Sequence, residues 1–312
     1  MVKKDFISVD PEVSSLQEVH NLLLGGVTPR PIALVSTLSE RGVNNLAPFS
    51  FFNAFGANPP YVAFSPAYSG RDGAAKDTLI NIRANMECVI HSVSHEIVEQ
   101  MSLASSAFPP EVDEFVKAGF TALPSHKVGP QRVAESAFHM ECVVEQIIEL
   151  GGSKGSGNLV LCRVVQFHIQ QGLILEGIIP PDLIDNIGRN SGAFYTRASG
   201  AAIFELNKPA GVGMGVDMLP DHIRQSHVLS GNDLGLLGGT DTLPTQAELK
   251  TFLVTPVSTS PKSYEQHFNS AKALALENRN LAIKQVELAA KEALEARDLQ
   301  FALRALLSIP LI

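Results

Sequence analysis

A proline inside an apolar, strand-like segment constrains the fold of this chain more than any other feature. Residues 32–37 are mostly apolar and β-branched, residues 39–42 have the composition of a turn, and residues 46–55 form a second apolar segment that contains Pro48. Because proline donates no backbone hydrogen bond, it belongs on an edge strand or at a bulge. The sequence therefore predicts a hairpin whose second strand lies at the edge of a sheet.

Further short strands and helices follow along the chain. Strands are predicted for residues 61–65, 87–93, 140–150 and 158–170, and the last two are joined by the glycine-rich turn GGSKGSG. Short helices are predicted for residues 78–84, 94–104 and 112–118. Many short strands with inserted helices are typical of a small barrel. The predicted fold class is mainly β with helices, an α+β architecture.

The composition of the chain changes near residue 180. We expect a first domain over residues 1–200 and a C-terminal extension over residues 201–312. Residues 201–261 lack long periodic elements, which predicts loops and a linker. Residues 262–308 are rich in Ala, Leu, Glu and Lys, which predicts one long helix, or two with a break near residues 296–298. This helical part is expected to pack on the barrel or on a second subunit.

Charge and cysteine content exclude several classes of protein. The net charge of −8 argues against nucleic-acid binding, which requires clustered Lys and Arg. No apolar run approaches the roughly 20 residues that cross a bilayer, and the N-terminus lacks the apolar core of a secretory signal. Cys88, Cys142 and Cys162 lie among apolar residues and form no CxxC pair, so they are expected to be buried, reduced thiols. We therefore expect a cytoplasmic protein that does not enter the membrane.

Small neutral hydrogen-bonding residues gather in two segments, residues 28–53 and 76–78. Hydroxyls, amides and fixed backbone beside one cationic cluster suit a flat cofactor that carries a phosphate. Lys76, Thr78 and the first N–H groups of the helix that begins there would hold the phosphate, and Arg71 and Arg30 are further candidates. The residues predicted to line the cofactor site are Thr28, Arg30, Ser36, Thr37, Asn44, Asn45, Ala47, Pro48, Ser50, Phe51, Asn53, Lys76, Asp77 and Thr78. No catalytic side chain is predicted, because no acid–base pair is evident.

Each of these residues also has a simpler structural interpretation. Asp77 or Thr78 would serve as an ordinary helix N-cap, and spacing alone favours that role. Ser36 and Thr37 would be ordinary strand residues. The phenylalanines of residues 49–55 are more often core residues than the walls of a cofactor site.

Five segments of the chain resemble a known family in the order in which they occur. RPIALVST, GVNNLAPFSFFN, NPPYVAFS, KDTLINI and VDEFVKAGF resemble the flavin-reductase-like proteins with the FMN-binding split β-barrel, over roughly Leu22 to Ile169. The resemblance implies a six-stranded barrel with Greek-key character, a homodimer, and one FMN per subunit at the dimer interface. It also implies NAD(P)H as a co-substrate.

Two other motifs argue against a dinucleotide-binding loop and against a metal site. The GGSKGSG loop leads into a strand, whereas a dinucleotide-binding loop leads into a helix. Many members of the resembled family have Gly-Asp-His at this place, where this chain has Gly157 and Asn158 without the His, which argues against a dedicated NAD(P)H site. His91 and His95 straddle a strand-to-helix boundary, so no metal site is predicted.

Three functions remain open at this point. The first is an FMN-dependent oxidoreductase of the flavin-reductase-like group, in which hydride passes from NAD(P)H to the flavin and then to a partner oxygenase or another acceptor. The second is a flavoenzyme with its own small organic substrate. The third is a non-catalytic flavin electron carrier, with the C-terminal helix as its docking surface.

Overall fold

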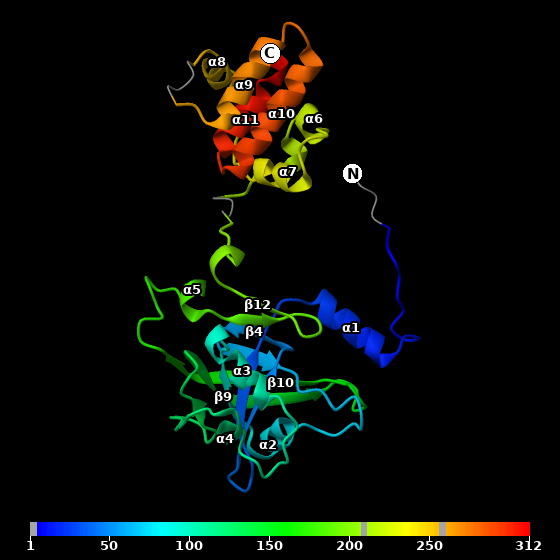
Figure 1. Ribbon diagram of the computed structural model, residues 1–312, viewed down its shortest axis with the longest axis vertical. Helices are drawn as coiled ribbons and strands as arrows, with labels where there is room; N and C mark the ends of the chain where they lie inside the picture. The colour runs from blue at the N-terminus through cyan, green and yellow to red at the C-terminus, as the bar shows by residue number, and fades with distance from the viewer. Residues whose placement is uncertain (1–4, 207–210, 256–259) are drawn as a thin grey trace. The chain divides into compact units, whose positions relative to one another are not determined.

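The computed structural model describes residues 5–206, 211–255 and 260–312. The chain forms two compact units, Met1–Phe204 and Glu205–Ile312, coloured blue to green and yellow to red in Figure 1. The first unit is built on a mostly antiparallel sheet, and the second is helical. Each unit is described below by itself.

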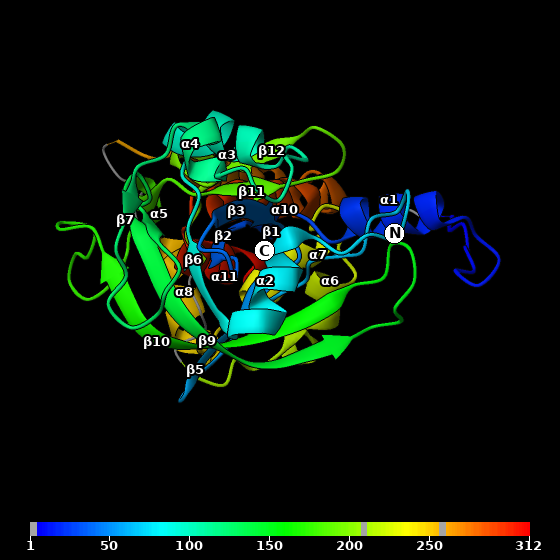
Figure 2. The same cartoon turned by 90° about the horizontal axis from the view of Figure 1, so that it is seen from below.

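A seven-stranded antiparallel sheet forms the first unit, with the strand order β3-β2-β6-β9-β10-β5-β4. In chain order its strands are β2 (Ala33–Leu38), β3 (Asn44–Phe49), β4 (Phe52–Ala57), β5 (Pro60–Phe64), β6 (Glu87–His91), β9 (Phe138–Glu149) and β10 (Asn158–Ile169). The long strands β9 and β10 run along one side of the unit in Figure 2. The predicted fold class is confirmed.

The sheet must curl, because its two edge strands are neighbours in the chain. Only Ser50 and Phe51 separate β3 from β4, although these strands stand at opposite ends of the order. In a flat sheet of seven strands, about 4.8 Å apart, the edges would lie roughly 29 Å from each other. The strand predicted over residues 46–55 is therefore two strands, and the sheet has seven strands where six were expected.

Pro48 lies on the edge strand, as predicted. It stands opposite Leu34 of β2, the only strand that pairs with β3 in the described part of the chain. The N–H of Leu46 points away from β2 and donates to the Glu114 carboxylate at 3.2 Å. Backbone groups two residues apart on a strand point to the same side, so the backbone nitrogen of Pro48, like that of Leu46, points away from β2. The N–H that proline lacks therefore removes no hydrogen bond from the sheet.

Shorter elements surround the barrel. The helices are α1 (Leu16–Gly26), α2 (Asp77–Asn85), η1 (His95–Ile97), α3 (Val98–Ala104), α4 (Glu114–Ala118), α5 (Pro181–Ile184) and η2 (Gly200–Ala202). A three-stranded sheet joins β1 (Arg30–Pro31), β11 (Ile187–Arg189) and β12 (Tyr195–Arg197), and a small hairpin joins β7 (Ala122–Leu123) to β8 (Arg132–Val133).

Two apolar cores hold the first unit together. One fills the barrel and includes the three cysteines, which are buried and free, as the sequence predicted. The other packs Leu34 and Leu46 of the sheet against Met101 of α3 and Phe115 of α4. The second core fixes α3 and α4 beside the free edge of β3.

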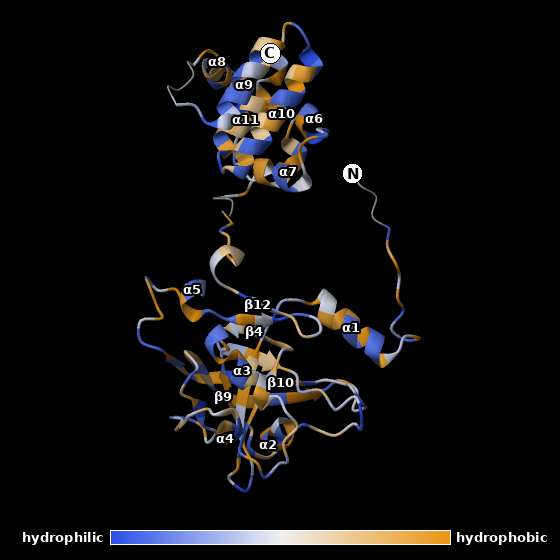
Figure 3. Cartoon of the chain, in the orientation of Figure 1, coloured by the Kyte–Doolittle hydropathy of each residue, from blue (hydrophilic) through white to orange (hydrophobic). Residues whose placement is uncertain are grey.

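The second unit consists of helices around a core of its own. They are η3 (Val216–Met218), α6 (Asp221–Arg224), α7 (Gly231–Gly238), α8 (Gln246–Val254), α9 (Ser263–Leu274), α10 (Arg279–Glu295), α11 (Leu299–Leu307) and η4 (Ile309–Leu311). Four of these helices, η3, α6, α7 and α8, lie in residues 201–261, which had been predicted as loops and a linker. In Figure 3, hydrophobic and hydrophilic residues alternate along α9 and α10, as expected for helices that cover a core with one face.

The helix predicted over residues 262–308 is broken twice. Asn278 caps α10 and Asp298 caps α11 through their side chains, because short polar side chains bind the free N–H groups of a first turn. The break near residues 296–298 was expected, and the one before Asn278 was missed. The core face of α10 carries Val286, Ala289 and Ala290 and packs on the other helices of its own unit.

Candidate functional site

A groove follows the outer edge of β3. It consists of two adjoining hollows with volumes of about 440 and 410 Å³. We call it the β3 groove and define it by the five residues that line both hollows, Pro48, Phe49, Ser69, Arg71 and Lys76. Its walls come from β3, the loop after β5, the start of α2 and the loop after α3. Because β3 is an edge strand, backbone groups that would otherwise bind a neighbouring strand face this space.

A buried polar network lies beneath the groove. The Asn45 side-chain oxygen accepts hydrogen bonds from the hydroxyls of Thr78 at 2.7 Å and Thr37 at 3.1 Å. The Asn45 amide donates to the Glu114 carboxylate at 3.1 Å, and the Asn81 amide donates to the Thr37 hydroxyl at 3.0 Å. The network therefore joins β2, β3, α2 and α4, and it fixes the start of α2 against the edge strand.

Lys76 stands at the N-cap position of α2, and no side chain caps this helix. The simple N-cap interpretation of Asp77 and Thr78 is therefore wrong, because the Thr78 hydroxyl is directed to Asn45 instead. The uncapped N–H groups and the helix dipole favour an anion at this end. Lys76 is exposed and adds a full positive charge there.

Glu114 is a buried acid in the wall of the groove. It is 5% exposed and accepts from Asn45 and from the Leu46 N–H. Burial raises the pKa of Glu114, and the nearby Asp77 adds to the rise. Sequence analysis missed Glu114 because it lies 69 residues from Asn45 in the chain.

The structure brings most of the predicted site residues to one place. Those that line the β3 groove are Arg30, Asn45, Ala47, Pro48, Ser50, Phe51, Lys76, Asp77 and Thr78. Thr37 lies beneath it in the buried network. The groove also contains residues that were not predicted, namely His20, Tyr68, Ser69, Arg189 and residues 104–108.

Four predicted side chains are directed elsewhere. The Ser36 hydroxyl donates to the Gln131 carbonyl, and the Thr28 hydroxyl donates to the Asn190 side chain. The Asn44 amide donates to Asp113 at 2.9 Å. Asn53 is exposed on β4, where its side chain accepts from the N–H of the next residue.

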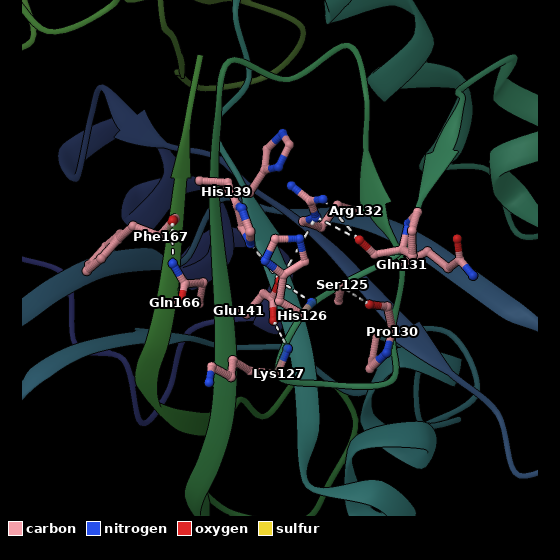
Figure 4. A network of polar contacts seen from close by, with 12 residues as sticks. Ser125, His126, Lys127, Pro130, Gln131, Arg132, His139, Glu141, Gln166 and Phe167 are labelled. Carbon is pink, nitrogen blue, oxygen red and sulfur yellow. Dashed lines mark hydrogen bonds and ion pairs between the residues drawn. The ribbon is translucent and has the colours of Figure 1, made fainter. Parts of the chain in front are cut away.

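A second polar centre, on β9, holds the segment of residues 124–133 (Figure 4). The buried Glu141 carboxylate accepts from the N–H groups of His126 at 2.8 Å and Lys127 at 2.6 Å, and it contacts the His168 ring at 2.6 Å. Although burial alone would raise it, these bonds hold the pKa of Glu141 below its ordinary value. In the described residues no group of three or more His, Cys, Asp and Glu is arranged to hold a metal ion.

The comparisons with known proteins agree with this fold. The profile of the flavin reductase like domain matches residues 24–178. A protein of Halalkalibacterium halodurans is 36% identical over 205 residues, which are 65% of this chain and 97% of that protein. The curled sheet and the groove on its free edge thus define a flavin-reductase-like split barrel. The chain belongs to the flavin reductase like family.

Two solved structures are similar over most of their length. Nitrilotriacetate monooxygenase component B from Bacillus cereus is 32% identical with a TM-score of 0.62, and the match covers 65% of this chain and all (100%) of that one. The 2-nitrobenzoate 2-nitroreductase NbaA from Pseudomonas fluorescens is 29% identical with a TM-score of 0.58, covering 69% of this chain and 99% of that one. Within the described residues, no helix has the length and apolar character needed to span a membrane.

Proposed function

We propose that this chain is an FMN-dependent oxidoreductase that binds its flavin in the β3 groove. The observation that carries this proposal is the combination of an unpaired strand edge with a cationic, uncapped helix start in one continuous space. The same space is also lined by neutral groups such as Ser50, Ser69 and Asn45, together with the carboxylates of Asp72, Asp77 and Glu114. These groups fit a flat ring with a phosphate-bearing side chain, so the residues present suit FMN.

Different residues of the groove would bind different parts of FMN. Lys76 and the first N–H groups of α2 would hold the phosphate. The outward carbonyls of Leu46 and Pro48 would accept hydrogen bonds from the edge of the ring, because neither carbonyl faces β2. The buried network at Asn45 holds these two parts at a fixed separation. Bound FMN would supply the hydride chemistry, and the chain would supply binding and orientation.

NAD(P)H is proposed as the electron donor and a partner oxygenase, or another acceptor, as the recipient. The similarity to component B of a monooxygenase supports this choice. A flavoenzyme with its own organic substrate is the second candidate, supported by the similarity to a nitroreductase and by the excess of cations in the groove. A cytoplasmic location belongs to the same proposal.

Replacing Lys76 tests the proposed phosphate site. We expect Lys76→Gln to weaken FMN binding about tenfold or more, because a charge-assisted hydrogen bond to phosphate contributes roughly 1.5–3 kcal/mol. Titration of the purified protein with FMN, followed by flavin fluorescence, measures the change. Lys117→Gln removes an exposed lysine from α4 and serves as the control. Equal affinities for the two variants, or no FMN binding by the wild-type protein, would reject the proposal.

A homodimer is also proposed, with an apolar face of the barrel as its interface. Two hollows of about 430 and 570 Å³ share Pro31, Phe52, Phe138 and Met140 in their lining. Phe167 extends this face and is 43% exposed. Burying such a surface favours association, since each Å² of apolar area contributes about 25 cal/mol.

The Phe167→Lys substitution should shift the protein towards monomers, because it places a charge in the proposed interface. Light scattering coupled to size-exclusion chromatography at several protein concentrations measures the mass. Phe194→Lys changes an equally apolar, more exposed residue outside these hollows and is the control. A monomeric wild-type protein, or an unchanged mass for the Phe167 variant, would contradict the proposed interface.

A further inference from the structure

Two arginines stand directly opposite each other beside the β3 groove. The antiparallel pairing of β1 with β11 makes Arg30 and Arg189 register partners. Directly opposite residues project on the same face of a sheet, where like charges are destabilising. The pKa of Arg30 is lowered by its burial and also by the charge of Arg189. The fold therefore maintains an unfavourable pair of positive charges at this place.

Gly188 allows this close approach. A Cβ at residue 188 would lie 2.8 Å from the Pro29 side chain and 3.4 Å from the Arg30 carbonyl oxygen. Only glycine leaves room for β11 to pair closely with β1 at this point. The glycine thus helps to hold the arginine pair in register.

No acid neutralises either arginine in the part of the chain that the structure describes. Arg30 is 3% exposed and donates to the carbonyls of Leu24 at 2.7 Å, Val27 at 2.5 Å and Asn190 at 3.0 Å. Arg189 donates to the Gly192 carbonyl at 2.7 Å and to the Tyr195 hydroxyl. These neutral partners orient the two guanidinium groups but leave their net charge uncompensated.

Both arginines face the larger hollow of the β3 groove. Its lining also includes Arg71, Lys76 and His20, and it includes no Asp or Glu. Such a lining is unusual in a chain with 24 Lys and Arg against 32 Asp and Glu. A concave space bordered by charges of one sign concentrates ions of the other sign.

Lys76 and the two arginines share the larger hollow, but only Lys76 continues into the second one. Lys76 also lines the second hollow, with Asp77 and Thr78, and neither arginine reaches that hollow. Arg189 also lines a small hollow of about 120 Å³ with Pro48, Ser105 and Tyr195. A phosphate bound in the second hollow, at the start of α2, would therefore contact neither arginine.

We propose that Arg30 and Arg189 form a second anion subsite, which binds the carboxylate or phosphate of the substrate that exchanges electrons with the flavin. The second substrate is thus an organic anion. This inference rests on the proposed function, with the FMN phosphate at the Lys76 end. Arg189 makes the direct contact, since its guanidinium retains donors and is stacked 4.7 Å from the centre of the Tyr195 ring. Arg30 is already bonded to three carbonyls and acts as a fixed positive charge behind it.

The test compares Arg189→Gln with Arg197→Gln in the full-length, FMN-loaded protein. Arg197 lies on the neighbouring strand β12, is exposed and is paired with Asp185, so it controls for the loss of one arginine from this sheet. The probes are NADPH, NADH and benzoate, titrated separately while the absorption spectrum of the bound flavin is recorded. FMN affinity is measured in parallel, and circular dichroism checks the fold of each variant.

We expect Arg189→Gln to weaken binding of at least one probe about tenfold or more, and to change FMN affinity by less than about twofold, since a charge-assisted contact is lost only at the second subsite. Arg197→Gln should bind the probes like the wild type. Arg189→Lys should be intermediate, because it retains the charge without the forked geometry. A loss confined to NADPH and NADH identifies a phosphate as the anion, and a loss confined to benzoate identifies a carboxylate.

Three results would overturn the inference, and they can be told apart. If no probe loses affinity in Arg189→Gln while FMN still binds, the second subsite is rejected and the proposed function stands. If Arg189→Gln weakens FMN as strongly as Lys76→Gln does, the arginines serve the flavin phosphate. If the wild-type protein does not bind FMN, the proposed function and this inference are rejected together.

Discussion

The Asn45→Ala variant should lose roughly 3–5 kcal/mol of stability, because it leaves two buried hydroxyl donors without an acceptor and removes a donor from a buried carboxylate. Asn45 is 7% exposed and serves the hydroxyls of Thr37 and Thr78 and the carboxylate of Glu114. Each buried hydroxyl donor without an acceptor costs about 1–3 kcal/mol, and a lost hydrogen bond to a buried carboxylate adds to this cost. The change should also loosen the start of α2 and weaken FMN binding.

Asn44→Ala provides a matched control for this prediction. Asn44 precedes Asn45 on the same strand, and its single hydrogen bond joins it to Asp113 near the surface. Removing it should cost about 1 kcal/mol or less. Because the chain has two units, unfolding in urea is best followed by hydrogen–deuterium exchange of peptides from residues 30–170. A similar loss of stability in the two variants would contradict the importance assigned to the buried network.

Acid should destabilise the first unit through His91. This side chain is completely buried between the Leu34 carbonyl, 2.8 Å from Nδ1, and the Val133 N–H, 3.0 Å from Nε2. One ring nitrogen donates and the other accepts, so the ring is neutral. Burial lowers the pKa of His91 to about 3, and the charges of His139 and Arg132 act in the same direction.

The sign of the pH effect follows from this lowered pKa. Below the ordinary value of about 6.5 the unfolded chain binds a proton at residue 91 that the folded chain does not bind. The stability that the neutral His91 contributes is therefore fully present above pH 6.5. Between pH 6.5 and the folded-state pKa, the free energy of unfolding falls by about 1.4 kcal/mol per pH unit. At pH 5 the contribution of His91 amounts to a loss of about 2 kcal/mol.

His91→Gln should flatten this dependence. The variant should be less stable than the wild type at pH 7.5, since Gln cannot reproduce both hydrogen bonds of the imidazole ring with the same geometry. It should lose less stability than the wild type between pH 7.5 and pH 5. His95→Gln changes an exposed histidine of the same unit and should retain the wild-type slope. Urea unfolding at half-unit pH intervals measures both slopes. Parallel curves for the wild type and His91→Gln would refute the assignment.

Local patterns in the sequence predicted the parts of the site that depend on local chemistry. Pro48 predicted the edge strand, because a missing N–H is tolerated only there. Lys76 and the helix that follows it predicted an anion-binding helix start. The five segments that resemble the family covered the strands that carry both features.

Side-chain direction accounts for predicted residues that the structure places away from the β3 groove. Ser36 and Thr37 are adjacent on β2, and adjacent strand residues point to opposite faces. They could not both face one cofactor, and the same holds for Asn44 and Asn45. The period of two was therefore a signal in the sequence that would have removed one member of each pair.

The remaining errors concern contacts between distant parts of the chain. Arg189 reaches the groove only because β11 pairs with β1, a register that no local pattern specifies. Glu114 does so because α4 packs beside β3. The division of residues 46–55 into two strands likewise follows from closure of the sheet. In the C-terminal unit, Asn278 caps α10, but it was not interpreted as a helix cap.

Pro48 has a consequence beyond the site itself. An open strand edge is a template on which a strand from another molecule can add, the first step of many aggregation reactions. Proline removes a donor from the middle of that edge and so acts as a gatekeeper against such growth. Pro48, which lines the groove on this edge strand, thereby disfavours the addition of a strand from another copy of the chain.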